Sequence, residues 1–360
     1  MKIIHIIDRL PPDGAERLLV DVLKNRNQAW DYQVICLVSG GALVQEILDM
    51  GVPVKIFAKK NPIDLRLLWQ LTQYLRQQKP DVVHTHLFTA DSWGRLAAWL
   101  ARVPHIFATV HSINSWKKTL HHKIDRYFSH VSQQIIACSP VVEKSLITSS
   151  HIATQKITTI SNGIDLNRFQ NTSALNLPKI FGFDKKSVVL AVIGRLHPAK
   201  GQQAVLPLMK KYLNMGLKVH LLLIGEGELK TQIEADIQQQ GLEQVVTLTG
   251  QRDDIPQLLA SIDILVIPSR WEGLPMVLLE AMVMKKAVIA YEVGGIPDVV
   301  RSGDNGILVE ANNTFSLEQH LHRLIVDAGL RRRLGRSAKQ DVEKYYNAQL
   351  VAKRYEQLYI

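Results

Sequence analysis

The most constraining feature of this sequence is a regular alternation of short β-rich runs with helical stretches, which occurs in two series. Such alternation is typical of parallel α/β sheets. The predicted strands are 2–7, 33–38, 54–57, 82–86, 105–111, 134–139 and 157–162 in the first series, and 187–194, 218–225, 245–250, 264–269, 287–291 and 306–309 in the second. From Ser316 onward the pattern is helical to the end. The sequence therefore predicts two doubly wound lobes of similar size.

The chain length supports the same division, because 360 residues exceed the size at which a single core keeps growing. A polar stretch closed by Pro178 separates the two series. We expect an N-terminal Rossmann-like domain over 1–168, a linker over 169–183 and a C-terminal Rossmann-like domain over 184–342. We expect the last helix, 343–360, to cross back to the N-terminal domain.

Charge and cysteine content narrow the class of protein. No apolar run reaches the ~20 residues that span a bilayer, and the first ten residues, interrupted by Asp8 and Arg9, predict a strand rather than a signal peptide. Cys36 and Cys138 lie in apolar runs, as expected for buried thiols in a reducing compartment, so we expect a cytoplasmic protein. The net charge of +10 lies mostly in the first half, which favours an anionic partner: a phosphorylated substrate, an acidic membrane or nucleic acid.

Doubly wound sheets bind ligands outside the carboxyl ends of their strands, and one loop there, "VIGRLHPAKG" (192–201), is rich in cations. It places Gly194, Arg195 and Lys200 after a predicted strand. Arginine binds phosphate oxygens in two-point fashion and lysine acts as a compact charge, so together they could neutralise a diphosphate. In "LIGEGELK" (223–230), Gly225 allows the backbone to approach a ligand closely.

A second loop, "RWEGLPMVLLEAM" (270–282), carries two carboxylates eight positions apart. Pro275 suits the first position of a helix, and the free N–H groups of that helix start would favour an anion. The residues around which these N–H groups lie are Leu274, Met276 and Val277. Glu280 sits inside the helix among apolar neighbours and needs partners, which two ribose hydroxyls could supply. Glu272 is placed in the turn to accept from a second polyol.

These loops and several further motifs, which follow one another along the chain in the order expected of the family, closely resemble the retaining GT-B glycosyltransferases of family 4. The motifs that carry the resemblance are the E-x7-E element from Glu272 to Glu280, "GRLHPAKG", "GEGEL", "GGIPDVVRSGDNGILVE", "SNGIDLNRF", "DGAERLLVDVL", "VVHTHLFTADSWGRLAA" and "TVHS". The resemblance runs from Ile3 to Tyr346. It implies an α/β fold of GT-B architecture, with two Rossmann-like lobes facing a central cleft.

The resemblance also implies a donor site on the second lobe for a nucleoside diphosphate sugar, with UDP favoured and GDP open. Arg195 and Lys200 would hold the diphosphate and stabilise the leaving group, Glu280 would bind the ribose and Glu272 the donor sugar. Backbone groups would complete the site: those of Gly194, Gly225, Gly273, Leu274, Met276 and Val277, with the base near Gly250 to Arg252. The acceptor would attack from the face that the leaving group occupies, with retention, so the two glutamates are not the acid and nucleophile of a retaining hydrolase, which lie ~5 Å apart.

In the first lobe, the family's glycine-rich loop corresponds to "RLPPDGAERLL", where Asp13 replaces one of two usual glycines and Gly14 remains. By the resemblance, Glu16 is the acid of that loop and contacts the acceptor. His111 of "TVHS" contacts the donor sugar beside the acceptor, and its role as a base stays open. His86 of "VVHTH" is expected to line the acceptor pocket.

No metal and no cofactor are expected. The chain contains no D-x-D pair, so the fixed cations would replace a carboxylate-bound Mg²⁺. His84 and His86 alternate along a strand and are expected to face opposite sides, which argues against a metal pair.

The segment 115–131 predicts a basic amphipathic helix. Its apolar face, which we expect to dock on the core, comprises Trp116, Leu120, Ile124, Tyr127 and Val131. The alternative is contact with anionic lipid at the inner face of the plasma membrane.

We thus expect a glycosyltransferase that uses a glycan or lipid-linked acceptor in polysaccharide, lipopolysaccharide or glycolipid biosynthesis. A nucleotide-sugar 2-epimerase of the same fold is one alternative, against which the E-x7-E element argues. The other is a non-enzymatic polyanion binder. Binding of nucleic acid is disfavoured because the basic residues are not concentrated in a stripe with interleaved aromatics.

Overall fold

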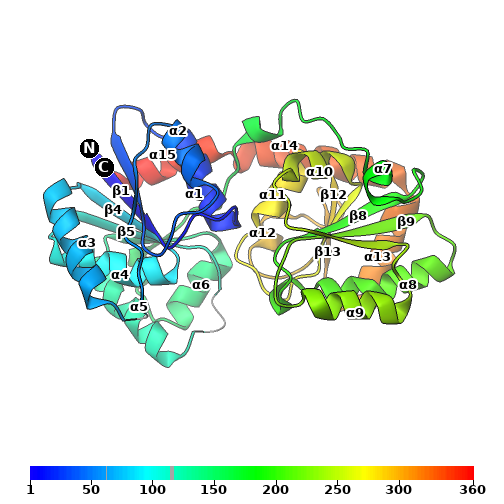
Figure 1. The fold of residues 1–360 in the computed structure, drawn as a ribbon, viewed down its shortest axis with the longest axis horizontal. Helices are drawn as coiled ribbons and strands as arrows, with labels where there is room; N and C mark the ends of the chain where they lie inside the picture. Colours follow the sequence, from blue (N-terminus) through cyan, green and yellow to red (C-terminus); the bar gives the residue numbers. More distant parts are fainter. Residues whose placement is uncertain (62, 114–116) are drawn as a thin grey trace. The chain divides into compact units, whose positions relative to one another are not determined.

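The computed structural model describes residues 1–61, 63–113 and 117–360. The chain forms two compact units (Figure 1). The first consists of Met1–Asp165 together with Ala348–Ile360, and the second of Leu166–Asn347.

The first unit is built on a seven-stranded parallel sheet. Its strands are β1 (Lys2–Ile7), β2 (Asp31–Cys36), β3 (Val54–Ile56), β4 (Val82–His86), β5 (His105–Val110), β6 (Gln134–Ala137) and β7 (Ile157–Thr159). They lie in the order β3-β2-β1-β4-β5-β6-β7. The order reverses between β1 and β4, where Ile3 pairs with Val82 and His5 with His84. Sheets of this kind bind ligands outside the carboxyl ends of their strands, at the position where the strand order reverses.

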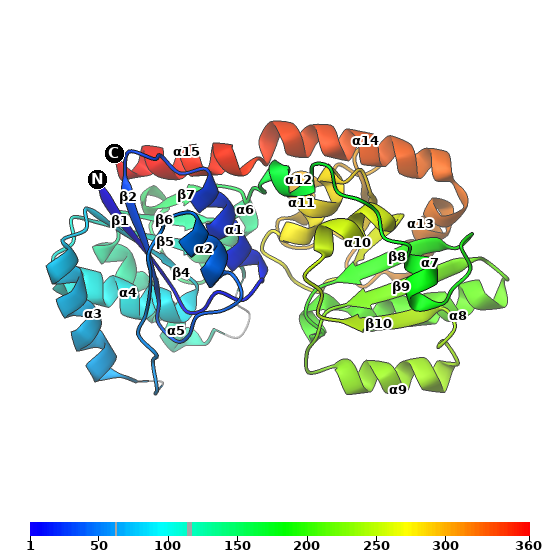
Figure 2. The same ribbon diagram turned by 45° about the horizontal axis from the view of Figure 1, so that its top comes forward.

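Helices cover both faces of this sheet (Figure 2). They are α1 (Gly14–Lys24), α2 (Val44–Asp49), α3 (Leu65–Gln78), α4 (Phe88–Leu100), α5 (Thr119–Val131), α6 (Pro140–Thr148) and α15 (Ala348–Tyr359), with a 3-10 turn, η1, at Thr154–Lys156. Ile4 and Ile6 of β1 pack in one core cluster with Leu71 of α3 and Ala97 of α4. Since side chains alternate along a strand, His5 points to the opposite face.

The second unit is built on a six-stranded parallel sheet in the order β10-β9-β8-β11-β12-β13. Its strands are β8 (Val188–Ile193), β9 (Val219–Ile224), β10 (Val246–Gly250), β11 (Ile264–Ile267), β12 (Ala287–Tyr291) and β13 (Ile307–Val309). The order reverses between β8 and β11, where Leu190 pairs with Ile264. The loops that follow these two strands are those that contain the predicted cations and carboxylates.

The helices of the second unit are α7 (Leu177–Phe181), α8 (Leu206–Asn214), α9 (Lys230–Gln240), α10 (Ile255–Ser261), α11 (Met276–Val283), α12 (Ile296–Val299), α13 (Thr314–Val326) and α14 (Ala328–Tyr345), with 3-10 turns η2 (Leu166–Phe169), η3 (Pro198–Lys200) and η4 (Gln202–Val205). One core cluster joins Leu190 and Val192 of β8 to Met209 of α8, Ile233 of α9 and Leu321 of α13. Burial of this continuous apolar layer stabilises the unit by roughly 25 cal/mol per Å² removed from water.

Every predicted strand occurs, with ends that differ by at most a few residues. The predicted linker, 169–183, is different: it belongs to the second unit and contains helix α7. The side chain of Asn176 caps α7, and Leu177 is only 1% exposed. The segment is polar, but the burial of Leu177 fixes it to the second unit, which its overall composition does not reveal. The last helix, α15, is grouped with the first unit.

Helix α5 differs from its prediction in which face is buried. Trp116 lies outside the described residues. Leu120 and Tyr127, expected to dock on the core, are 66% and 63% exposed. The buried positions are instead Asp125 and Ser129. A buried ion pair accounts for this, because Lys117 Nζ donates to Asp125 at 2.7 Å with both side chains under 10% exposed.

Candidate functional site

The loops after β8 and β11 in the second unit bring a cation and a carboxylate together. Lys200 Nζ donates to Glu272 Oε1 at 2.7 Å, and Ser269 Oγ donates to the same oxygen, also at 2.7 Å. Glu272 is 8% exposed, whereas the Lys200 side chain is 28% exposed. The carboxylate therefore holds the ammonium group at the end of the sheet, where a ligand can still reach it.

Glycines allow these loops to pack backbone against backbone. Gly201 has a φ of +63°, and a Cβ there would lie 2.1 Å from the carbonyl oxygen of Pro268. Gly294, with a φ of +58°, would place a Cβ 2.2 Å from the carbonyl oxygen of Glu272. Because no side chain fits at either position, Gly201 lets the lysine loop pack closely on the glutamate loop, and Gly294 lets the loop after β12 do the same from another side.

Glu280 lies five residues into α11 and is 7% exposed. The expected need for a partner is met by the protein, since Arg168 of η2 approaches Glu280 Oε1 with its Nη1 at 3.4 Å. The Arg168 guanidinium also lies 5.2 Å from the ring centre of Phe169. The structure thus places an arginine next to the carboxylate that the sequence assigned to a ribose.

The remaining predicted donor-site residues lie around the same sheet end. Pro275 is the N-cap of α11 rather than its first residue, so the helix begins one position later, at Met276. Arg195 is exposed, and Gly194 adopts a φ of +145° that brings the Lys200 side chain against it. Arg252 forms a two-point contact with Asp254, at 2.8 and 2.5 Å.

Two further glycines and the start of α11 complete this end of the sheet. Gly225 N donates to the carbonyl oxygen of Gly250 at 2.9 Å, so the turns after β9 and β10 are joined. A Cβ on Gly225 would lie 2.2 Å from the carbonyl oxygen of Gly194. Gly273 accepts a hydrogen bond from Gly295 N at 2.5 Å. The last predicted positions, Leu274, Met276 and Val277, are at least partly buried.

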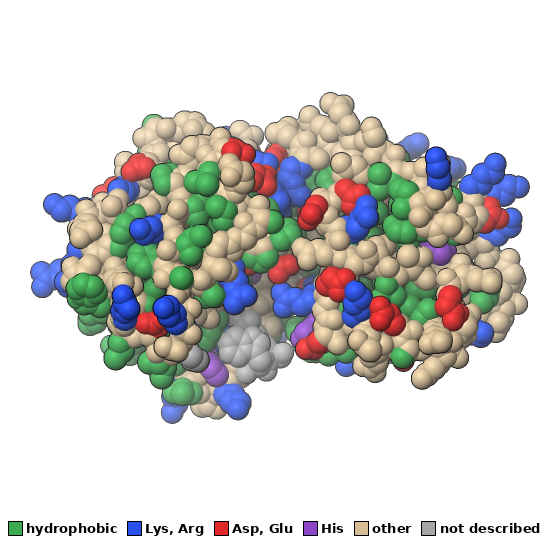
Figure 3. Space-filling model, in the orientation of Figure 1, with side chains coloured by type: hydrophobic (Ala, Val, Ile, Leu, Met, Phe, Trp, Pro, Cys, Tyr) green, Lys and Arg blue, Asp and Glu red, His purple; other side chains and the backbone are tan. Residues whose placement is uncertain are grey.

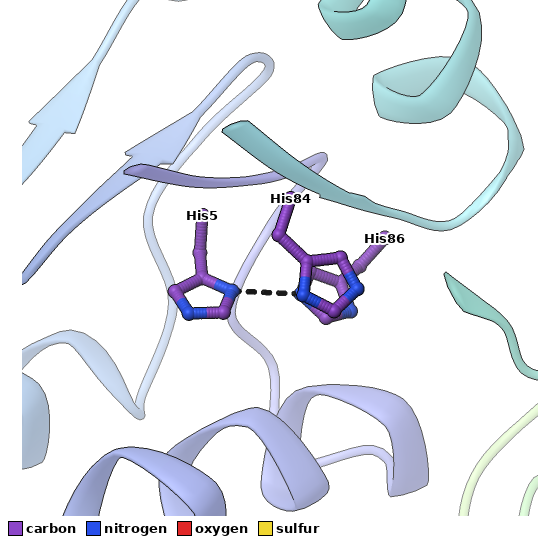
Figure 4. A group of neighbouring side chains, drawn as sticks. All are labelled: His5, His84 and His86. Carbon is purple, nitrogen blue, oxygen red and sulfur yellow. Dashed lines mark hydrogen bonds between the residues drawn. The ribbon is translucent and has the colours of Figure 1, made fainter. Parts of the chain in front are cut away.

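In the first unit, four histidines from three adjacent strands lie together. His5 of β1, His84 and His86 of β4 have ligand nitrogens within 4.8 Å of one another (Figure 4). The prediction that His84 and His86 face opposite sides is wrong: residues two apart on a strand share a face, and the two rings stack at 4.4 Å. His111 follows β5 and joins the group through His86.

Hydrogen bonds connect three of these histidines in a row. His5 Nδ1 and His86 Nε2 are 3.0 Å apart, and His86 Nδ1 and His111 Nε2 are 3.2 Å apart. His86 was expected to line the acceptor pocket, but it is 2% exposed and both of its ring nitrogens are occupied. It therefore supports His111 rather than facing a ligand.

Burial keeps all four imidazoles neutral at pH 7. It lowers the pKa of His111 to about 4 and that of His5 to about 3, and it lowers the pKa values of His84 and His86 well below the ordinary value. The cause is the cost of placing a charged ring in a low-dielectric interior.

Neutral imidazoles are the form that binds metals, so the group His5, His84 and His86 is a candidate metal site. Both nitrogens of His84 are already engaged, however: Nδ1 with the Tyr359 hydroxyl at 2.5 Å and Nε2 with Thr109 Oγ1 at 2.7 Å. A metal bound by all three rings would have to displace one of these hydroxyls. The arrangement fits a hydrogen-bonded network better than a coordination shell.

The glycine-rich loop leads into α1, which begins at Gly14 with Asp13 as its N-cap. Glu16, in the first turn, is 6% exposed. The nearby carboxyl group of Asp8, directly after β1, has its pKa raised to about 6 by burial. The loop therefore carries acids close to the end of β1, where Glu16 was predicted to contact an acceptor.

A hollow of about 510 Å³ lies elsewhere in the second unit, at the amino ends of β8, β9 and β10. It is lined by Phe183, Lys218 and His220 among others, and the rings of Phe183 and His220 stack at 4.0 Å. This hollow is at the wrong end of the sheet for a doubly wound ligand site.

Three residues of these clusters were not assigned a role from the sequence: Arg168, Ser269 and His5. Arg168 lies within "SNGIDLNRF" and Ser269 directly precedes "RWEG", but the contacts of both side chains depend on the folded structure. His5 stands alone in an apolar strand, and only the β1–β4 pairing places it beside His84.

Two protein-family models match the sequence: Glycosyltransferase Family 4 over residues 12–168 and Glycosyl transferases group 1 over residues 174–341. The UDP-Gal:alpha-D-GlcNAc-diphosphoundecaprenol alpha-1,3-galactosyltransferase of Escherichia coli is 29% identical over 84% of this chain and 81% of its own. The capsular polysaccharide biosynthesis glycosyltransferase CapM of Staphylococcus aureus is 26% identical over 88% and 84%.

Among solved structures, Anabaena Alr3699/HepE in complex with UDP-glucose superimposes with a TM-score of 0.88 at 22% identity, covering 99% of this chain and 98% of that one. The fold and these matches together define a GT-B glycosyltransferase. The chain belongs to family 4 of these enzymes.

Proposed function

We propose that this chain transfers a sugar from a UDP-sugar, with a GDP-sugar as the second candidate donor, to a glycan or lipid-linked acceptor in polysaccharide, lipopolysaccharide or glycolipid biosynthesis. The observation that carries the proposal is the Lys200–Glu272 pair at the point where the strand order of the second unit reverses. An exposed Arg195 lies on the same loop. The Escherichia coli relative is named for a UDP-Gal donor and a diphosphoundecaprenol-linked acceptor, which agrees with this chemistry.

The site suits the charge changes of the reaction. Cleavage of the bond between sugar and diphosphate leaves negative charge on the departing phosphate, and cations fixed in advance stabilise it. We assign this role to Lys200 and Arg195. Glu272 would orient the ammonium group while its carboxylate contacts the donor sugar, and Glu280 with Arg168 would hold the ribose.

We further propose that transfer proceeds with retention and without a metal ion. Lys200 and Arg195 supply the positive charge that a divalent ion would otherwise provide. The proposal predicts that EDTA leaves transfer unchanged and that the anomeric configuration of the product matches that of the donor. Strict dependence on a divalent ion would contradict it.

A donor screen tests the proposed function. The purified protein is incubated with UDP- and GDP-sugars, and free nucleotide is followed over hours. We expect slow donor hydrolysis with one class of donor, faster in the presence of a lipid-linked acceptor. Hydrolysis of none of them would contradict the assignment.

We also propose a cytoplasmic location with peripheral contact to an anionic membrane, made by the first unit. None of the helices among the described residues has the length and hydropathy that crossing a bilayer needs. Leu120 and Tyr127 of α5, Trp69 of α3 and Trp99 of α4 are each more than half exposed. Lys118, Lys123 and Arg126, which are close to Leu120 and Tyr127 in sequence, are also exposed, and their positive charge suits an acidic lipid surface.

Vesicle co-sedimentation tests the membrane contact. We expect binding to vesicles with phosphatidylglycerol and little binding to phosphatidylcholine alone. Leu120→Ser with Tyr127→Ser should reduce binding, whereas Phe315→Ser, an exposed apolar position of the second unit at 69%, should not. Equal binding by the double variant would contradict the assignment to α5.

Nucleic acid is not part of this proposal. In Figure 3, the Lys and Arg side chains on the face shown lie scattered among apolar and acidic ones in both units. A nucleic-acid site would gather them into a patch or stripe.

A further inference from the structure

We propose that His5, His86 and His111 form one hydrogen-bonded chain that holds His111 as a neutral imidazole with its proton on Nδ1. His111 then acts as a hydrogen-bond donor to an oxygen of a bound substrate, and His5 and His86 are positioning residues that fix its tautomer. The inference rests on the proposed function only for the identity of that oxygen.

The two links couple the protonation of all three rings. A neutral imidazole has one nitrogen that donates and one that accepts. If His86 donates through Nδ1 to His111 Nε2, then His86 Nε2 must accept from His5 Nδ1. If instead His111 donates through Nε2 to His86 Nδ1, then His86 donates through Nε2 to His5 Nδ1. Both distances, 3.0 and 3.2 Å, are those of hydrogen bonds. Three neutral rings can therefore make both bonds with only two arrangements of their protons.

The arrangements differ in which end of the chain carries the third proton. In one it lies on His5 Nε2, and in the other on His111 Nδ1. Both atoms are buried and have no hydrogen-bond partner in the part of the chain that the structure describes. A buried N–H without an acceptor is costly, so the end where an acceptor can arrive decides the outcome.

The two ends differ in their surroundings, although His111 Nδ1 and His5 Nε2 are both covered in this structure. His5 is 1% exposed in the middle of β1, with Tyr32 stacked on it at 6.2 Å and His84 beside it. His111 is only partly buried and follows the carboxyl end of β5, where doubly wound sheets bind ligands. We infer that a ligand at this sheet end brings an oxygen to His111 Nδ1 and so selects the arrangement with the proton on that atom.

The fourth histidine stabilises the chain without belonging to it. His84 stacks on His86 at 4.4 Å, but its own nitrogens are bound to Tyr359 of α15 and Thr109 of β5. The C-terminal helix thus closes the network from one side. Nδ1 of His111 already carries a proton and has no free lone pair, and Nε2 accepts the hydrogen bond from His86, so His111 in this state is not a general base.

Nitrogen NMR of histidine-labelled protein tests the proposal, because protonated and bare ring nitrogens resonate far apart. The spectrum is recorded at pH 7.5 with and without UDP, and His111→Gln identifies the His111 signals. We expect His111 to show a protonated Nδ1 and a bare Nε2. A bare Nδ1 in the presence of UDP and a donor sugar analogue would overturn the proposal.

Variants along the chain separate tautomer control from a structural role. His86→Phe breaks both links, so we expect His111 to shift toward the other tautomer and transfer to fall about tenfold, as for the loss of one hydrogen bond to the substrate. His5→Asn keeps an amide donor near the Nδ1 position and should preserve the His111 tautomer, whereas His5→Leu should produce a mixture. His220→Gln, a buried histidine of the second unit, is the matched control and should leave the His111 spectrum unchanged.

Two outcomes would contradict the hydrogen-bonded chain of His5, His86 and His111. An unchanged His111 tautomer in both His86→Phe and His5→Leu would overturn it. Binding of one equivalent of zinc, lost in His84→Ala, would also overturn it in favour of a metal site. If the tautomers are as expected but no donor is ever hydrolysed, the inference about the three histidines is supported and the proposed function is contradicted.

Discussion

At the scale of single residues, the positive charge of Lys200 at the carboxyl end of the second sheet is expected to determine the rate of transfer. A hydrogen bond from Lys200 Nζ to Glu272 fixes the position of this charge. Lys200→Ala removes a cation placed for the leaving phosphate, so we expect kcat/KM to fall by about 100-fold or more. Steady-state kinetics measure this. Lys218→Ala, a lysine of the same unit paired with Asp184, is the control and should turn over normally. Equal kinetics for both variants would contradict the role of Lys200.

A second residue-scale prediction concerns Glu280. Glu280→Gln keeps the shape of the side chain but removes the charge that Arg168 and a ribose would share. We expect nucleotide affinity to fall about 10-fold, since hydrogen bonds to charged groups contribute about 1.5–3 kcal/mol. Calorimetric titration with UDP measures it. Glu318→Gln, another ion-paired glutamate of this unit, should bind UDP as the wild type does; a similar loss there would point to a general effect.

At the scale of elements, α4 depends on a buried ion pair. Arg95 Nη2 donates to Asp91 at 2.6 Å, and both residues are almost fully buried. Arg95→Met leaves the carboxylate without its cation, so we expect the free energy of unfolding to fall by about 3–5 kcal/mol. Urea unfolding of the first unit measures it. Adding Asp91→Leu should recover much of the loss; a double variant no more stable than Arg95→Met would contradict the pairing.

The elements also show where prediction from sequence succeeds. Strands such as β8 and β12 are continuous apolar runs bounded by glycine or polar residues, and such runs indicate buried parallel strands by themselves. Helix α5 shows the limit. Its apolar stripe predicted a docked face, but the buried side is set by Asp125 meeting Lys117 and Ser150, which are distant or outside the helix. Periodicity cannot reveal such partners.

At the scale of the whole molecule, the same limit applies to the candidate site. The loops carrying Lys200 and Glu272 were predicted to share a ligand from the sheet rule, and the structure joins them directly. Their neighbours Arg168 and Ser269 could not be predicted, because sequence gives no distance between separate loops. The histidine network required the strand order β1-β4-β5, which a single sequence does not determine.

Acid should destabilise the molecule through its buried histidines. Their pKa values are lowered on folding, so below the ordinary value of 6.5 the unfolded chain binds more protons, and stability falls with pH. The loss continues until the folded values are reached, about 4 for His111 and about 3 for His5. Each group contributes up to about 1.4 kcal/mol per pH unit. Urea titrations at several pH values from 7.5 to 4.5 measure the slope.

A matched variant isolates the histidine contribution to this pH dependence. His5→Asn removes one titrating group and should reduce the slope below pH 6 by about 1.4 kcal/mol per pH unit. Surface histidines such as His130 serve as the control, because His130→Asn changes an exposed ring. Equal stability of the wild type at pH 7.5 and pH 5 would contradict the neutral state of the network.

The account depends most on one claim, that the carboxyl-end loops of the second unit bind the diphosphate of a nucleotide sugar. A crystal structure with UDP bound tests it directly. The account predicts phosphate oxygens within hydrogen-bond distance of Lys200 and Arg195, with the ribose hydroxyls at Glu280. Nucleotide bound instead in the hollow by Phe183 and His220, with Lys200 still paired only to Glu272, would contradict it.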